Sequence, residues 1–140
     1  MSLRVFLDTN IILDLLGKRD PFYKPAAKVA TLADQKQFTL VVSALSFANV
    51  NYIITKFEGR DIALNKLRKF KVLAEVVALD EVIIDKSLNS DFSDFEDALQ
   101  YYSALSAGCS VIISRNAKDF TVSEIPVMSA AEYLTSINRN

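Results

Sequence analysis

Short apolar runs alternate along the chain with longer segments whose apolar residues recur at helical spacing. The short runs have the length and the β-branched content of strands, and the longer segments are amphipathic. Strands are predicted at 3–7, 38–42, 72–79, 111–113 and 125–128. Helices are predicted from the end of the first strand to Leu16, and over 25–36, 43–57, 60–70, 80–89, 94–107 and 129–138. Because strands alternate with helices, the pattern predicts an α/β fold whose parallel sheet is covered on both faces.

Length and composition favour one compact domain. The chain has 140 residues with only 3 glycines and 3 prolines, so residues 1–140 are predicted to fold as a single unit. No apolar run reaches the ~18–20 residues of a membrane span, and Asp8 and Asp14 interrupt the run that a signal peptide would need. The single cysteine, Cys109, is predicted to be a small core residue of a cytoplasmic protein.

The sequence contains no histidine. This excludes Ser-His-Asp and Cys-His nucleophiles, imidazole bases and nearly all zinc sites. Any hydrolytic chemistry must therefore use carboxylates, hydroxyls, lysine or arginine. Carboxylates together with amides favour hard cations such as Mg²⁺ and Mn²⁺.

Polar side chains follow two of the predicted strands at the point where each strand ends. In the stretch RVFLDTNIILDLL, the first strand is followed by the polar step Asp8, Thr9 and Asn10. The strand 111–113 is followed by the polar residues Ser114, Asn116 and Asp119. Ligands of α/β folds bind beyond the carboxyl ends of the strands, so two strand ends are predicted to deliver acids to one edge of the sheet.

The helix that begins in SDFEDALQYY brings further acids. Ser93 and Glu96 match the S-x-x-E pattern of a capping box, which gives Glu96 a structural duty. Asp94 would lie in the first turn, where a carboxylate stabilises the helix dipole. An apolar stripe is predicted at Phe95, Ala98, Leu99, Tyr102 and Leu105, which leaves Asp94 and Asp97 together on an adjoining face. Taken alone, Asp97 is better explained as a surface residue than as a site residue.

Asn49 occupies an unusual place in the helix capped by Ser43. The predicted apolar stripe of this helix is Leu45, Ala48, Tyr52 and Ile53, and Asn49 falls within it by helical spacing. A buried amide costs a few kcal/mol unless it is hydrogen-bonded. Asn49 is therefore either a satisfied core amide or a group that faces a polar pocket.

Charge is distributed unevenly although the net charge is only −1. Segment 56–71 is rich in lysine and arginine, and segment 75–97 is rich in aspartate and glutamate. The two segments could be solvated helix faces of opposite sign. Alternatively, the basic segment could hold a phosphate backbone through Lys66 and Lys69, beside an acidic site that collects cations.

Taken together, LDTNIILDLL and DFEDALQYYSALSAGCSVIISRNAKDF resemble the PIN-domain family of metal-dependent ribonucleases, over essentially the whole chain. The resemblance implies a three-layer α/β/α sandwich around a parallel sheet with strand order 3-2-1-4-5. It also implies hydrolysis of RNA phosphodiester bonds with Mg²⁺ or Mn²⁺. Many members are the toxin half of a toxin–antitoxin pair, so the resemblance further implies an antitoxin partner and a homodimer.

The resemblance assigns roles position by position. Asp8, Asp97 and Asp119 match the acidic metal ligands of the family, and Asp94 could add a further carboxylate. Asn10, Ser114 and Asn116 match its supporting polar residues. Asn49 is a departure, because many members have glutamate there. Clustered carboxylates repel one another without a cation, so the three acids are expected to converge within reach of a shared ion.

Other classes of function remain open at this point. The chain could be a catalytically inactive PIN-like module that binds RNA or a protein. It could be an aspartate-based phosphotransfer domain with Asp8 as nucleophile, although the phosphatase pattern requires aspartate at position 10, where Asn10 stands. It could also be a plain structural domain.

Overall fold

The computed structural model describes residues 3–138 and contains one five-stranded sheet. The strands are β1 (Arg4–Leu7), β2 (Thr39–Ser43), β3 (Ala74–Val77), β4 (Val111–Ile113) and β5 (Val127–Met128). All neighbouring pairs are parallel, and the order across the sheet is β3-β2-β1-β4-β5, which confirms the expected order. In the centre, Val5 is in register with Leu40 on one side and with Val111 on the other.

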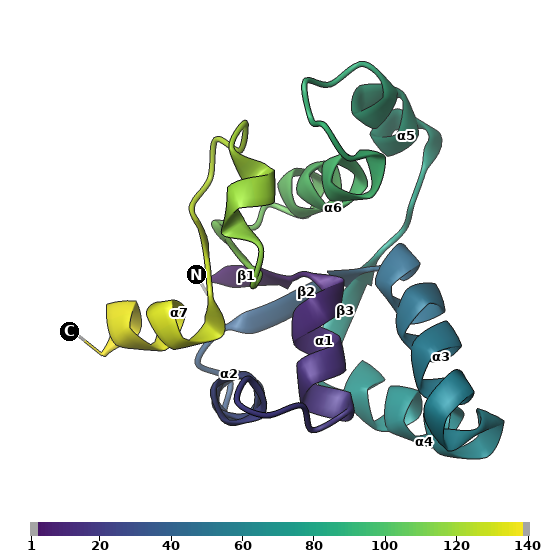
Figure 1. Cartoon of the computed structure of the whole chain (residues 1–140). Helices are drawn as coiled ribbons and strands as arrows, with labels where there is room; N and C mark the ends of the chain where they lie inside the picture. The colour runs from purple at the N-terminus through teal and green to yellow at the C-terminus, as the bar shows by residue number, and fades with distance from the viewer. Residues whose placement is uncertain (1–2, 139–140) are drawn as a thin grey trace.

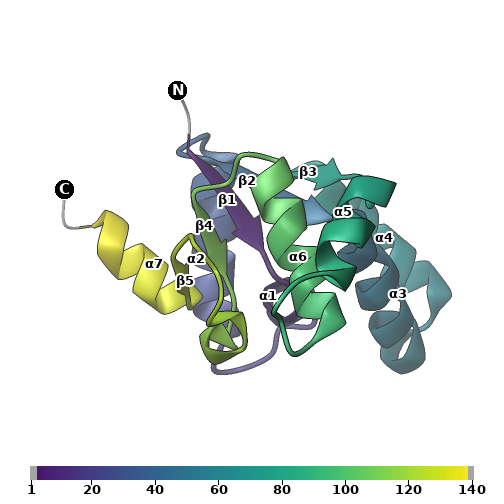
Figure 2. The ribbon, with the colours of Figure 1, turned by 90° about the horizontal axis from the view of Figure 1, so that it is seen from above.

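Helices cover both faces of the sheet, so the molecule has the expected α/β/α layers (Figure 1). One layer contains α1 (Thr9–Leu16), α2 (Tyr23–Asp34), α3 (Ala44–Glu58), α4 (Arg60–Lys71) and α7 (Ala130–Ile137). The other contains α6 (Phe95–Ser106), with α5 (Glu81–Leu88) packed against it, and the short 3₁₀ helix η1 (Ala117–Phe120). Figure 2 shows α5 and α6 lying over the strands, with α3 and α4 behind.

Each face of the sheet has its own apolar core, because successive side chains of a strand point to opposite faces. Val5 and Leu7 pack into the core beneath α1, α2 and α3. Phe6, which lies between them, packs into the core under α6, together with Ile112 and Cys109. Cys109 is buried, as predicted, and desolvation raises the pKa of its thiol to about 11.

Most predicted elements are present, with shifted ends. Strand 72–79 is shortened to β3 because residues 72–73 form a turn, and helix 25–36 lies two residues earlier, as α2. The predicted strand 125–128 is reduced to β5, and η1 was not predicted. None of the helices within residues 3–138 is long and apolar enough to cross a membrane.

The start of α6 differs from its prediction. The predicted capping box of Ser93 and Glu96 is wrong, because Asp94 is the N-cap and its Oδ1 accepts a 3.0 Å hydrogen bond from the backbone N–H of Asp97. The side chain of Glu96 is therefore free for another partner. The predicted apolar stripe of α6 is also wrong at its ends, because Phe95 and Leu105 are exposed.

Candidate active site

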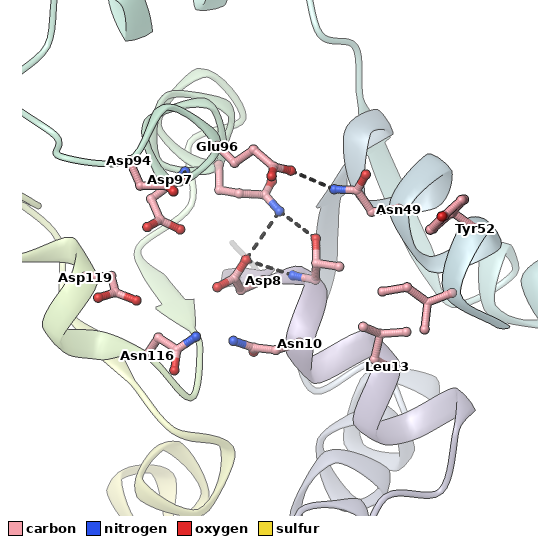
Figure 3. A pocket seen from close by; sticks show the side chains of 13 residues that line it. Asp8, Asn10, Leu13, Asn49, Tyr52, Asp94, Glu96, Asp97, Asn116 and Asp119 are labelled. Carbon is pink, nitrogen blue, oxygen red and sulfur yellow. Dashed lines mark hydrogen bonds between the residues drawn. The ribbon is translucent and has the colours of Figure 1, made fainter. Parts of the chain in front are cut away.

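An open pocket of about 490 Å³ lies at the carboxyl edge of β1 and β4 (Figure 3). Its wall carries five carboxylates and four amides, contributed by four segments that are far apart in the sequence. The acids are Asp8, Asp94, Glu96, Asp97 and Asp119, and the amides are Asn10, Asn49, Gln100 and Asn116. Figure 3 shows the carboxylates of Asp8, Asp97 and Asp119 directed toward the same space. Asp8 and Asp119, which follow two different strands, thus lie at one edge of the sheet, as expected.

Asp8 is fixed at the end of β1 by several hydrogen bonds. Its backbone N–H donates to the carbonyl of Ile113 at 3.0 Å, which continues the β1–β4 ladder past the last strand residue. Its Oδ1 accepts from the N–H of Thr9 at 2.8 Å and thereby caps α1, and its Oδ2 accepts from Ser114 Oγ at 2.8 Å. Asp8 is nevertheless buried, and this desolvation raises the pKa of its carboxyl group, while these hydrogen bonds lower it.

Gln100 of α6 supports Asp8 from the interior. Its Nε2 lies 3.3 Å from Asp8 Oδ1, 3.0 Å from Thr9 Oγ1 and 2.9 Å from Ser46 Oγ. The two hydroxyl groups are also hydrogen-bonded to each other, at 2.8 Å. Gln100 is 3% exposed, and its Oε1 has no hydrogen-bond partner within residues 3–138. Sequence reasoning missed this network, although Gln100 follows Asp97 by three residues and so shares its side of the helix.

The ionisation of Asp97 is strongly disturbed by its surroundings. Partial burial is the largest cause, and the neighbouring charges of Asp94, Asp8, Asp119 and Glu96 add to it. Together they raise the pKa of Asp97 to about 7. A bound cation would relieve this repulsion, so the electrostatics of the pocket suit a positively charged ligand.

Asp119 reaches the same space from η1. Its backbone N–H donates to the carbonyl of Asn116 at 2.8 Å, which holds the acid in a tight turn after β4. Asn116 in turn donates its N–H to Ser114 Oγ at 3.0 Å. Asn10 Nδ2 lies 3.5 Å from the same hydroxyl oxygen. Ser114 thus links Asp8 to both asparagines, which face one another at the pocket (Figure 3).

The donor set is chemically suited to a hard divalent cation, because it consists of carboxylate and amide oxygens. Within residues 3–138, however, no three carboxylate, thiol or imidazole groups are gathered closely enough to hold an ion by themselves. Magnesium sites commonly use one or two carboxylates and complete their coordination with water and substrate phosphate. The open pocket leaves room for such ligands.

Asn49 lines the polar pocket and is not an amide enclosed in the apolar core. The predicted stripe of α3 is wrong, because Tyr52 is 70% exposed and the fully buried positions are Ser46, Val50 and Ile54. Asn49 lies beside this buried face, and its Nδ2 donates a 2.9 Å hydrogen bond to Glu96 Oε1. Ser43 caps the helix, as predicted, by accepting from the N–H of Leu45 at 3.1 Å.

Lys66 and Lys69 do not line this pocket. They lie on α4 beside a separate groove that is mainly apolar. Lys66 Nζ donates to the carbonyl of Leu16 and to Glu58 Oε1, both at 2.8 Å, so its ammonium group is engaged within the protein. The RNA contacts expected of these two lysines stay a prediction.

The chain is similar in sequence to known proteins. A sequence model described as the PIN domain matches residues 4–118. The chain belongs to the PIN-domain family. It is 27% identical over 137 residues to a curated relative, Ribonuclease VapC1 of Aquifex aeolicus (strain VF5), and the match covers 94% of each chain.

Solved structures share the fold of this PIN domain. A toxin–antitoxin complex from Klebsiella pneumoniae contains a chain with a TM-score of 0.66 and 20% identity, over 90% of this chain and 97% of that one. The Mycobacterium tuberculosis protein VapC20, described as a sarcin-ricin loop cleaving toxin, has a TM-score of 0.67 and 13% identity, over 84% and 94% of the two chains. At such identities the likeness concerns the fold alone.

Proposed function

We propose that this PIN domain is a ribonuclease that hydrolyses RNA phosphodiester bonds with Mg²⁺ or Mn²⁺. The observation that carries the proposal is the convergence of Asp8, Asp97 and Asp119 on one open pocket in a chain of this family. The likeness to Ribonuclease VapC1 over nearly the whole chain supports RNA as the substrate.

Asp8, Asp97 and Asp119 would supply the carboxylate ligands, with Asp94 at the edge of the set, and water and substrate phosphate would complete the coordination. A bound divalent cation neutralises the phosphate and lowers the pKa of a water nucleophile. Asp8 presents a fixed carboxylate, because Ser114, Thr9 and Gln100 restrict its orientation. Asp94 caps α6 through Oδ1, as Asp8 caps α1, and its other oxygen could add a further ligand.

Asn10 and Asn116 would position the substrate. Their amides lie at the pocket and can donate to phosphate oxygens without adding negative charge. Ser114 acts behind them, because its hydroxyl group donates to Asp8 and accepts from the backbone of Asn116. Ser114 would therefore orient both the carboxylate of Asp8 and the segment that carries Asn116.

Asn49 carries no charge, but Glu96 is hydrogen-bonded to it and lines the same pocket. We infer that Glu96 supplies the negative charge that many family members place at position 49. This assigns Asn49 the role of holding Glu96 on the pocket side of α6.

The same proposal includes a protein partner. Likeness to a chain of a toxin–antitoxin complex supports an antitoxin as that partner, with a homodimer as the expected assembly. A cytoplasmic location is expected for an enzyme that acts on RNA. Lys69 is the better candidate of the two lysines for a backbone contact, because it is exposed whereas Lys66 is engaged.

Aspartyl phosphotransfer is less consistent with the site. A phosphorylated aspartate must be reached by its phosphodonor, whereas Asp8 is 7% exposed and both of its carboxylate oxygens accept hydrogen bonds.

End-labelled single-stranded RNA provides the test. We expect cleavage with Mg²⁺ or Mn²⁺, no cleavage in EDTA and no cleavage by Asp97→Asn. Asp85→Asn, which changes an exposed carboxylate on α5, serves as the matched control and should cleave normally. Cleavage that persists in EDTA would contradict the proposal, and failure of the wild type to cleave RNA under any metal condition would favour the inactive binding module.

A further inference from the structure

A second pocket, of about 360 Å³, adjoins the acidic site. Its walls are mainly apolar and come from α1, the loop before α2, the first turn of α2 and the start of α7, with Ile11, Pro21, Phe22, Pro25 and Ala130 among them. Two pairs of consecutive residues separate the pockets: Asn10 lines the first and Ile11 the second, and Asn116 lines the first and Arg115 the second. At two places in the chain, neighbouring residues therefore line different pockets, one the acidic pocket and the other the second pocket.

Arg115 is the cation of this second pocket, and it is held in place on several sides. Its Nε donates a 2.8 Å hydrogen bond to Oδ2 of Asp14, and its guanidinium carbon lies 4.1 Å from the centre of the Phe22 ring. Its backbone N–H lies 3.4 Å from Asn10 Oδ1. A guanidinium group that is already ordered loses little conformational entropy when it binds an anion.

The anchoring leaves part of the guanidinium group unused. Within residues 3–138, no hydrogen bond engages the terminal nitrogens of Arg115, and 27% of its side chain is exposed. Asp14 is completely buried and is also paired with Arg19, whose Nε lies 3.1 Å from Oδ1. One carboxylate neutralises one cation, so Asp14 leaves the positive charge of one of the two arginines unbalanced. A purely structural ion pair does not require that excess.

We propose that this second pocket binds a nucleotide of the RNA substrate next to the cleaved bond, with its phosphate on Arg115 and its base against the apolar walls. Pockets of ~300–1,000 Å³ with apolar walls and a few fixed polar groups are typical of small-molecule ligands. Arginine is suited to phosphate because its paired donors match two phosphate oxygens. Continuity with the acidic pocket favours RNA over a protein carboxylate. The inference rests on the proposed ribonuclease function.

Arg115→Gln and Arg19→Gln form a matched pair for testing this site. Both arginines contact the same buried carboxylate through the same nitrogen, but only Arg115 lines the pocket. Binding of a fluorescent ten-nucleotide single-stranded RNA is measured by anisotropy in EDTA, so that neither cleavage nor metal contributes. We expect Arg115→Gln to weaken binding about tenfold at low salt and to lower the slope of log K against log salt by about 0.7, the value for one phosphate contact on a single strand.

Arg19→Gln should bind this RNA within about twofold of the wild type, as expected for a residue that makes no phosphate contact. Equal weakening by both variants would overturn the proposal, because Arg115 would then act only through Asp14. Unchanged binding by Arg115→Gln would also overturn it, and would leave a protein partner as the occupant if that variant lost the partner instead.

A measurement on the wild type keeps the test independent of variant folding. In EDTA, the same RNA should shift the backbone amide resonances of Ala130 and Ala131, which line the second pocket and lie outside the acidic one. Unshifted resonances with RNA bound would contradict the proposal. Failure of this site is distinguishable from failure of the ribonuclease function, because binding here is measured without metal and cleavage is tested by Asp97→Asn.

Discussion

The side-chain amide of Asn49 on α3 donates a 2.9 Å hydrogen bond to the carboxylate of Glu96 on α6. This contact joins the two helices that flank the pocket and holds the Glu96 carboxylate at the pocket wall. Under the proposed function, Glu96 would supply the charge that Asn49 lacks.

Asn49→Glu should affect metal binding and stability in opposite directions. The change removes the hydrogen bond and sets two carboxylates against each other, so the metal-free protein should lose roughly 1–3 kcal/mol of unfolding free energy. It also adds a negative charge at the pocket, so calorimetric titration should show tighter Mn²⁺ binding. Asn49→Leu removes the hydrogen bond without adding charge, so it should lose stability and show no gain in Mn²⁺ affinity. An unchanged Mn²⁺ affinity in Asn49→Glu would mean that a charge at position 49 does not act on the bound ion.

The pKa of Asp97 makes the stability of the metal-free protein depend on pH. Its pKa of about 7 lies above the ordinary aspartate value of 3.8, so between these limits the folded protein binds more protons than the unfolded chain. Folding stability contributed by Asp97 should therefore fall as pH rises from about 4 to about 7. In Asp97→Asn this decline should be reduced, and the variant should melt at a higher temperature than the wild type at pH 8 in EDTA.

Thermal unfolding between pH 4 and pH 8 checks this prediction, with Asp85→Asn as the control. The backbone N–H of Asp97, which donates to the capping carboxylate of Asp94, is retained in the asparagine variant. A lower melting temperature for Asp97→Asn at pH 8 would show that the carboxylate stabilises the fold and would contradict the electrostatic explanation.

Gln100 is expected to act through Asp8. Its hydrogen bond lowers the pKa of that carboxyl group, so Gln100→Leu should raise the pKa of Asp8 further and shift the acidic limb of the cleavage profile to higher pH. Loss of a side chain that orients a metal ligand commonly reduces metal affinity or activity by about 10- to 100-fold. The pH–rate profile is the decisive measurement, since a purely structural defect would lower the rate at every pH without moving the limb.

Local patterns in the sequence predicted the parts of the site that depend on local structure. Asp8 and Asp119 were placed correctly because each follows a strand, and parallel strands bring their carboxyl ends to one edge. Ser43 was identified as a cap because a serine at the end of a strand precedes a helical pattern.

The incorrect predictions have identifiable physical causes. Ser93 and Asp94 are adjacent residues that can both cap a helix. The S-x-x-E pattern therefore predicted a helix start at Ser93, one residue before the observed N-cap. The helix α3 carries apolar residues on more than one side, and periodicity alone selected the exposed Tyr52 instead of Val50. The pairing of Asp14 with Arg115 spans 101 positions and therefore leaves no local pattern in the sequence.

The central claim is that Asp8, Asp97 and Asp119 share a divalent cation. Anomalous diffraction from crystals of the protein soaked in Mn²⁺ tests it most directly, because the signal locates the ion without reference to activity. We predict a peak within ~2.0–2.6 Å of oxygens from at least two of these carboxylates, the range of distances for hard divalent cations. Strong manganese peaks elsewhere in the crystal, with none between these side chains, would contradict the account.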